Sequence, residues 1–173
     1  MKSGFASVFS FPNPVNEVSA RLVAGGVLTM AVLVVALDQR WLLPVLAYGF
    51  VARVLTGPKL SPLGQLVTRV ITPAMPVEAR LVPGPPKRFA QGVGMAFSLT
   101  ATVLLFGFDQ VGAAKVVLSL LIVAAFLESA LGICLGCKAF ALLMRAGVIP
   151  RAVCEECNDL WNARPRMTSS ATR

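Results

Sequence analysis

Four long apolar stretches limit what this chain can fold into. They cover residues 22–37, 41–52, 89–108 and 116–136. A helix needs about 20 apolar residues to cross the hydrocarbon core of a bilayer, and residues 89–108 and 116–136 reach that length unaided. The first stretch reaches it with residues 19 and 20, and the second only if its helix continues past Arg53. Only 14% of the residues are charged, against about 25% in a soluble domain. We therefore predict an all-α integral membrane protein.

The predicted architecture is a four-helix transmembrane bundle with spans over residues 19–37, 41–56, 88–108 and 112–134. Three spans with a re-entrant segment are the alternative. Ser61-Pro62 is typical of a helix start, and it opens a predicted cytoplasmic amphipathic helix over 61–72 with one apolar face. The members of that face are Leu63, Leu66, Val67 and Val70. Five prolines predict an extended linker over 72–87.

A second interfacial helix is predicted over residues 137–147, after a break at Gly132 or Gly136. Residues 1–150 then form the membrane domain. Residues 151–173 form a cytoplasmic tail whose end is disordered. Before the first span, Asn16 or Ser19 is the predicted helix cap.

Basic residues predict the orientation. With four spans, 14 of the 16 lysines and arginines fall on one side, and only Arg40 and Lys115 on the other. The positive-inside rule then places both termini and the central loop in the cytoplasm. The net charge of +8 favours membrane lipid as the partner of these basic faces, and not nucleic acid.

The first Cys-x-x-Cys motif, Cys134 and Cys137, lies where the last apolar stretch ends. The chain has four cysteines and no histidine, which removes every site that needs an imidazole. Thiols at i and i+3 can close a disulfide or share a metal, and a helix N-terminus lowers a thiol pKa. If a helix begins here, Lys138 would add to that effect. The alternative is that both cysteines are small packing residues beside the helix-contact pattern Gly132-x-x-x-Gly136.

The second motif, Cys154-Glu-Glu-Cys157, lies in a polar segment where packing does not explain two cysteines. Together the two motifs have the spacing of a four-cysteine zinc site. The apolar helix between them and the two glutamates disfavour zinc. Thiol redox chemistry, sulfur transfer and metal binding remain open alternatives, with zinc as the one cofactor to test.

Glu128 is the acid inside a predicted span, which makes it a functional candidate by default. At 1.5 Å per residue it lies about 18 Å from the outer face, and Arg53 reaches a similar depth. We therefore predict that Glu128 and Arg53 form an ion pair. The pair either pins two helices together or holds a proton-handling carboxylate near the dithiol.

Three segments together resemble a bacterial membrane family, number 4395 in the domain-of-unknown-function series. They are Phe126-Leu-Glu128-x-x-x-Gly132-x-Cys134-Leu-Gly-Cys137, Gly57-Pro58 with Ser61-Pro62-x-Gly64, and Pro86-Lys87-Arg88-Phe89-Ala90-Gln91. The resemblance covers roughly residues 10–145, so Cys154 and Cys157 lie outside it. The family has no established activity. Its members are often encoded near thioredoxin-like proteins or sulfurtransferases, which implies thiol or sulfur handling by association.

The sequence therefore predicts a membrane thiol-redox or sulfur-relay component. Cys134 and Cys137 are the expected exchanging pair, and Cys154 and Cys157 a second pair. A thioredoxin-like or sulfurtransferase protein is the expected partner, and a homo-oligomer is compatible with the pattern. The alternative is a non-catalytic scaffold in which all four cysteines bind a structural zinc.

Overall fold

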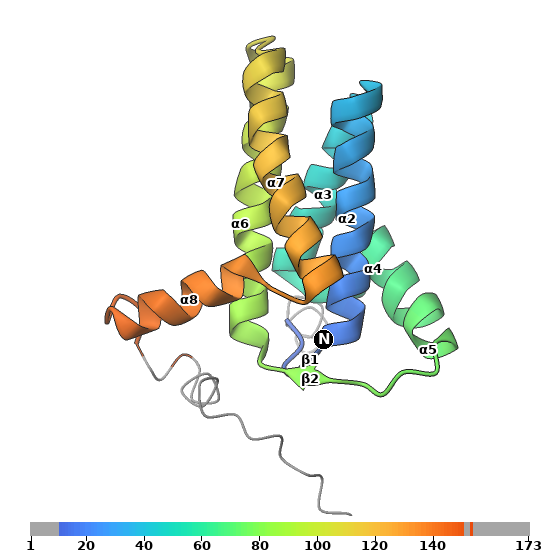
Figure 1. Ribbon diagram of the computed structural model, residues 1–173, viewed down its shortest axis with the longest axis vertical. Helices are drawn as coiled ribbons and strands as arrows, with labels where there is room; N and C mark the ends of the chain where they lie inside the picture. The colour runs from blue at the N-terminus through green and yellow to red at the C-terminus, as the bar shows by residue number, and fades with distance from the viewer. Residues whose placement is uncertain (1–10, 151–152, 154–173) are drawn as a thin grey trace, which may run out of the picture.

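The computed structural model describes residues 11–150 and residue 153, and it is largely helical (Figure 1). The longer helices are α2 (Glu17–Leu37), α3 (Leu42–Thr56), α6 (Gly84–Thr102), α7 (Val111–Leu131) and α8 (Leu135–Arg145). The short elements are β1 (Val15–Asn16), η1 (Gly57–Lys59), α4 (Pro62–Leu66), η2 (Val67–Ile71), α5 (Thr72–Ala74), β2 (Leu81–Val82) and η3 (Val103–Gly107), which continues α6.

Helices α2, α3, α6 and α7 lie side by side, while α8 projects away from them (Figure 1). Helix α2 packs against α7 and α3, and α6 packs against α3 and α7. The side chains between them are aliphatic and aromatic, among them Val27, Leu43, Leu46, Phe50 and Leu118. The outward faces are apolar too, with exposed residues such as Val32, Leu99, Phe106, Leu120 and Val123. Apolar outer faces of this kind fit a lipid environment.

Three helices are long and apolar enough to cross a membrane: Glu17–Leu37, Gly84–Gly107 and Val111–Leu131. Helix α3 occupies nearly the range predicted for the second span, but it has only 15 residues. At 1.5 Å per residue it is about 22 Å long, short of the roughly 30 Å of hydrocarbon. A fourth crossing by α3 therefore stays a prediction.

The chain segments around Arg40 and Lys115, the two basic residues predicted to lie on the side away from the cytoplasm, do lie together. Asp38 follows α2 in the left-handed conformation, with φ of 53°. Its carboxylate lies 3.7 Å from the Lys115 ammonium in the first turns of α7. It also pairs with Arg40, 3.1 Å away. Arg40 and Lys115 thus both lie next to Asp38, at the same end of the helices.

The segment after α3 begins its helix as predicted. Ser61 caps α4 by accepting a hydrogen bond from the Gly64 N–H, and Pro62 occupies the first turn. The single apolar face predicted there is not confirmed. Val67 is fully buried, but Leu66 and Val70 are about half exposed on another side. Val67 and Val70 lie in the π-helical turn η2, where the rotation per residue is smaller than in an α-helix.

Helix α6 begins four residues before the predicted span. The extended linker predicted up to residue 87 is therefore wrong at its end, because Gly84 to Lys87 form the first turn. Proline is tolerated there, since a first-turn N–H has no helical partner to lose. This earlier start places Lys87 on a helix that packs against α7 and α8.

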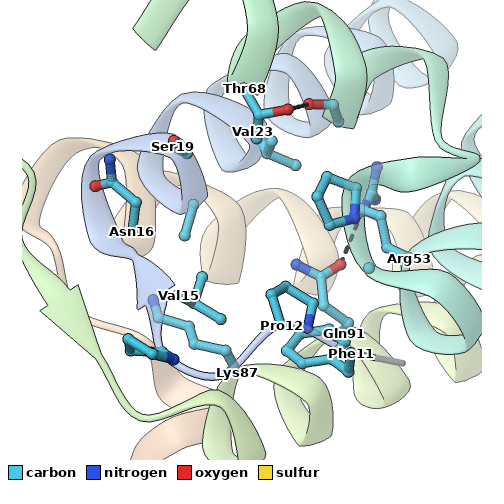
Figure 2. A pocket seen from close by; sticks show the side chains of 15 residues that line it. Phe11, Pro12, Val15, Asn16, Ser19, Val23, Arg53, Thr68, Lys87 and Gln91 are labelled. Carbon is cyan, nitrogen blue, oxygen red and sulfur yellow. Dashed lines mark hydrogen bonds between the residues drawn. The ribbon is translucent and has the colours of Figure 1, made fainter. Parts of the chain in front are cut away.

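The segment that precedes α2 contacts the residues just before α6 and at its start. Asn16 caps α2 through the Val18 N–H, as predicted. Strand β1 pairs with β2, which the sequence did not indicate. Asn13 accepts a hydrogen bond from the Gly84 N–H at 2.9 Å. Side chains of this segment, α2, α3, α4 and α6 line a small pocket (Figure 2).

Candidate functional site: a cysteine pair at a helix start

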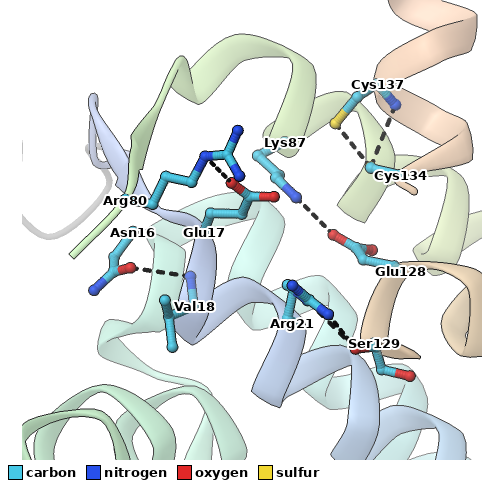
Figure 3. Close-up of polar contacts among 10 residues, drawn as sticks. All are labelled: Asn16, Glu17, Val18, Arg21, Arg80, Lys87, Glu128, Ser129, Cys134 and Cys137. Carbon is cyan, nitrogen blue, oxygen red and sulfur yellow. Dashed lines mark hydrogen bonds and ion pairs between the residues drawn. The ribbon is translucent and has the colours of Figure 1, made fainter. Parts of the chain in front are cut away.

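The site lies where α7 ends and α8 begins. Helix α7 stops at Leu131 because Gly132 takes the left-handed conformation, with φ of 68°, which suits glycine. Arg21 of α2 donates hydrogen bonds to the carbonyls of Ser129 and Ala130, two of the last acceptors of α7 (Figure 3). The predicted break at Gly132 is confirmed, and it turns the chain toward α6.

Cys134 is the N-cap of α8. Its sulfur accepts the Cys137 backbone N–H at 3.4 Å. The Cys137 thiol donates to the same sulfur, and the two sulfur atoms are 2.7 Å apart (Figure 3). A disulfide bond is about 2.05 Å long, so closing one needs only a small movement. Both cysteines are free thiols, and the placement of this motif at a helix start is confirmed.

Close packing fixes the first turn of α8 against α6. A Cβ on Gly136 would lie 2.5 Å from the Ala90 Cβ and 2.6 Å from its Cα, so only glycine fits. Further along α8, the Phe140 ring packs on Phe89 at a centroid distance of 5.6 Å. Helix α8 occupies nearly the range predicted for the second interfacial helix, two residues earlier at each end, and its position at the membrane interface stays a prediction.

Glu128 does not pair with Arg53, so that prediction is wrong. Its carboxylate accepts a hydrogen bond from the Lys87 ammonium at 2.7 Å instead (Figure 3). The Lys87 side chain is 9% exposed and the Glu128 side chain 18%. The sequence offered no signal for Lys87 beyond its place in the Pro86-Lys87-Arg88 segment, because the predicted linker kept it off the helix.

Arg53 has neutral partners. Its Nε donates to the Gln91 side-chain oxygen at 2.9 Å, and its Nη1 donates to the Ser61 hydroxyl at 3.2 Å. The guanidinium lies over the Phe50 ring, 4.5 Å from the ring centre. Glu128 still acts on Arg53 electrostatically. The two residues thus share a neighbourhood, but they make no direct contact.

The two thiols differ in acidity. The hydrogen bond from Cys137 lowers the pKa of Cys134 below its ordinary value, and the positive charge of Lys87 acts in the same direction. Burial and the Glu128 carboxylate oppose that shift. The pKa of Cys137 is raised, first because its proton is held in the bond to Cys134 and then by burial. Lys138 is exposed, and the cation that lowers the Cys134 pKa is Lys87.

Cys134 is only 8% exposed, but it borders a cavity of about 390 Å³. The cavity lies among α2, α3, α6, α7 and α8, and its walls are apolar except at Gln91, Glu128 and Cys134. A mostly apolar space, with the Glu128 carboxylate in its wall, therefore lies next to Cys134.

The second predicted pair, Cys154 and Cys157, lies outside the described residues. Within residues 11–150 and 153, no group of three or more histidine, cysteine, aspartate or glutamate side chains is arranged to hold a metal. A four-cysteine zinc site would need the second pair, so zinc binding stays a prediction.

Comparison with known proteins identifies the family of this chain but gives no activity for it. No curated protein and no solved structure matches the sequence. Residues 15–145 match a family described as a domain of unknown function, DUF4395. The match covers the strand pair, all the helices and the first cysteine motif, and it ends before the second motif. The chain belongs to the DUF4395 family.

Proposed function

We propose that this protein is a membrane thiol–disulfide exchange component in which Cys134 and Cys137 are the exchanging pair. The observation that carries the proposal is the geometry of that pair. One sulfur receives both a thiol proton and a backbone N–H at the start of α8, and the other sulfur is 2.7 Å away. Exchange needs a thiolate with a second thiol in reach.

The proposed step begins with the Cys134 thiolate, the more acidic of the two thiols. It bonds to one sulfur of a partner's disulfide, and the other partner sulfur leaves and takes up a proton. Cys137 then loses its proton and attacks the Cys134 sulfur. The mixed disulfide breaks, the partner leaves as a dithiol, and a Cys134–Cys137 disulfide remains. Two electrons and two protons pass to the partner.

The membrane setting is part of the proposal. Three helices fit a membrane by length and composition. We propose that α3 adds a fourth crossing and that both termini face the cytoplasm of a bacterial plasma membrane. The dithiol then lies on the reducing side, where thioredoxin-like or sulfurtransferase proteins are suitable partners. A dithiol that cycles between its reduced and oxidised forms suits that compartment better than a permanent disulfide, because thiols are kept reduced there.

A redox titration tests the proposal. Membranes carrying the protein with Cys154 and Cys157 replaced by serine are equilibrated with dithiothreitol buffers of graded potential, then acid-quenched and labelled with a maleimide that adds mass. We expect Cys134 and Cys137 to become unavailable for labelling together. For such a two-electron couple, the ratio of dithiol to disulfide changes tenfold per about 30 mV. Thiols that stay free, or that oxidise independently, would contradict it.

Metal analysis of the full chain addresses the zinc alternative. If the four cysteines hold structural zinc, purified protein contains about one zinc per chain, and its thiols resist alkylation until a chelator is added. Under the exchange proposal, alkylation of Cys134 and Cys137 does not depend on a chelator.

A further inference from the structure

Arg53 carries a buried hydrogen-bond donor that no residue in the described part of the chain satisfies. The residue is 4% exposed. Its Nε and Nη1 bond to Gln91 and Ser61, while its Nη2 is fully buried and has no partner among residues 11–150 and 153. Leaving a buried charged group unsatisfied is costly, so such a donor calls for an explanation.

The same region has an excess of positive charge. Arg53 and Lys87 contribute two positive charges, and the ion pair with Glu128 uses only that of Lys87. The hydrogen-bond partners of Arg53 are both neutral. A water molecule would satisfy the free N–H but not the charge. A buried charge without a counter-ion is unfavourable, and in a membrane protein it marks a functional site by default.

Arg53 and Lys87 both line the small pocket shown in Figure 2. Its volume is about 190 Å³, well above the roughly 10–15 Å³ that a single water needs. Most of its wall is apolar, from residues such as Pro12, Val15 and Val23. The pocket is thus large enough for a small oxyanion and has two cations in its lining.

Motifs singled out in the sequence converge on this pocket although they are far apart in the chain. Gly57 and Pro58 come from η1, Gly64 from α4, and Lys87 and Gln91 from α6. The exchange function proposed for the cysteines makes no use of the first three. They do, however, shape the wall around Arg53.

We propose that this pocket binds a tetrahedral oxyanion, a phosphate or sulfate group held by the Arg53 guanidinium with Lys87 as the second cation. Arginine suits such a ligand because its N–H groups match the spacing of oxyanion oxygens. The group can belong to a free anion or to a lipid headgroup, since basic pockets between membrane helices bind headgroups. This inference goes beyond the proposed exchange function and does not depend on it.

The test uses full-length protein in detergent, stripped of lipid, with Cys134 and Cys137 replaced by serine so that thiol chemistry plays no part. Serine keeps the helix cap at position 134. Melting temperature is followed while sulfate, phosphate or phosphatidic acid is added at constant ionic strength with chloride. We expect a saturable rise in melting temperature. A response to the inorganic ions identifies a free anion, and a response to phosphatidic acid alone identifies a headgroup. No response to any of the three would overturn the proposal.

Variants assign the effect to the pocket. Arg53→Met should fold without added anion, because an apolar side chain removes the unpaired charge, and it should lose the anion response. Arg53→Lys keeps the charge without the fork of N–H groups, and it should bind about tenfold more weakly or worse. Arg88→Met is the control, since Arg88 lies exposed on α6 beside Lys87 and outside the pocket lining, and it should respond as the parent does. An unchanged response in both Arg53 variants would overturn the site.

Discussion

At the scale of single residues, Cys134 combines three influences on one sulfur atom. The Cys137 thiol and backbone N–H both donate to it. Lys87 supplies positive charge, but the opposing effect of Glu128 on the Cys134 pKa is larger, so the hydrogen bond from Cys137 is the main cause of the lowered pKa. These influences favour the thiolate of Cys134 and the thiol of Cys137 at the same time. An exchanging pair requires this difference in acidity, because one sulfur attacks first as a thiolate and the other stays protonated until the second step.

The hydrogen bond to Cys134 can be tested by the pH dependence of its alkylation. With Cys154 and Cys157 replaced, two variants leave Cys134 as the single thiol. Cys137→Ser keeps a donor to the sulfur, and Cys137→Ala removes it. A lost donor destabilises the thiolate, so the pKa of Cys134 should be higher in the alanine variant. Equal midpoints in the two rate profiles would show that this bond does not set the acidity.

Removing either charge of the Lys87–Glu128 pair should shift the pKa of Cys134, in opposite directions for the two residues. With Cys134 as the single thiol, Lys87→Met removes a positive charge, so the pKa of Cys134 should rise. Glu128→Gln removes a negative charge, so that pKa should fall. Each single change also leaves a buried partner unpaired, at a cost of about 1–3 kcal/mol in the free energy of unfolding. Alkylation profiles and melting curves measure both effects.

The double variant Lys87→Met/Glu128→Gln is the control for this pair. It leaves no unpaired charge, so its loss of stability should be smaller than the sum of the single losses. Shifts of the Cys134 midpoint in the same direction for both single variants would indicate a general disturbance of the site, and would contradict the electrostatic account.

The sequence revealed the cysteines but not the cation beside them. Cys-x-x-Cys spacing and a glycine break were enough to predict a thiol at a helix start. The partner of Glu128 was predicted from depth alone, and rise per residue gives height along a helix axis but not the direction a side chain faces. Lys87 was excluded because the prolines before it were interpreted as a linker.

At the scale of helices, the position of the dithiol depends on how α8 leaves α7 and touches α6. Gly132 ends α7 in a conformation that other residues adopt at a cost, and Gly136 allows α8 to approach Ala90. Prediction of helix ends succeeded where a glycine or a capping side chain marks them, as at Asn16 and Ser61. It failed at Gly84, where prolines can either begin a helix or exclude one.

Gly136→Ala tests the contact between α6 and α8. The added Cβ would overlap the Ala90 side chain and backbone, so the first turn of α8 must move away. We expect a loss of about 1–3 kcal/mol in the free energy of unfolding, as for overpacking elsewhere. The redox midpoint of the cysteine pair should shift as well. Melting curves and the redox titration measure these changes.

Gly112→Ala is the matched control, because a Cβ there meets nothing within 4 Å. It should change the free energy of unfolding by less than about 0.5 kcal/mol and leave the redox midpoint in place. If Gly136→Ala behaved like this control, the close approach of α8 to α6 would not support the dithiol.

At the scale of the whole molecule, the lengths of the apolar stretches predicted the four long helices. The distribution of charge predicted that the segments around Arg40 and Lys115 lie at the same end of these helices. They did not predict the β1–β2 pair or the pocket around Arg53. These features depend on contacts between the N-terminal segment and residues about 70 positions later, and no local pattern encodes such contacts. Apolar length also cannot settle whether α3, at 15 residues, crosses the membrane.

Reporter fusions test the number of crossings. A fluorescent protein that folds only in the cytoplasm is attached at the N-terminus or after Trp161, and a phosphatase active only after export is inserted near Lys115. With four crossings, both fluorescent fusions should be bright and the phosphatase active. Three crossings would place the two ends of the chain on opposite sides, so that one of the fluorescent fusions stays dark.

The most direct measurement of the central claim is exchange with a small disulfide, followed by mass spectrometry of the intact protein. With Cys154 and Cys157 replaced, reduced protein is mixed with oxidised glutathione. The protein that keeps both Cys134 and Cys137 should form an internal disulfide and release two reduced glutathione molecules. The Cys137→Ser variant should instead retain one glutathione on Cys134. An unmodified Cys134 in that variant, or a lasting glutathione adduct when both cysteines are present, would contradict a paired exchange site.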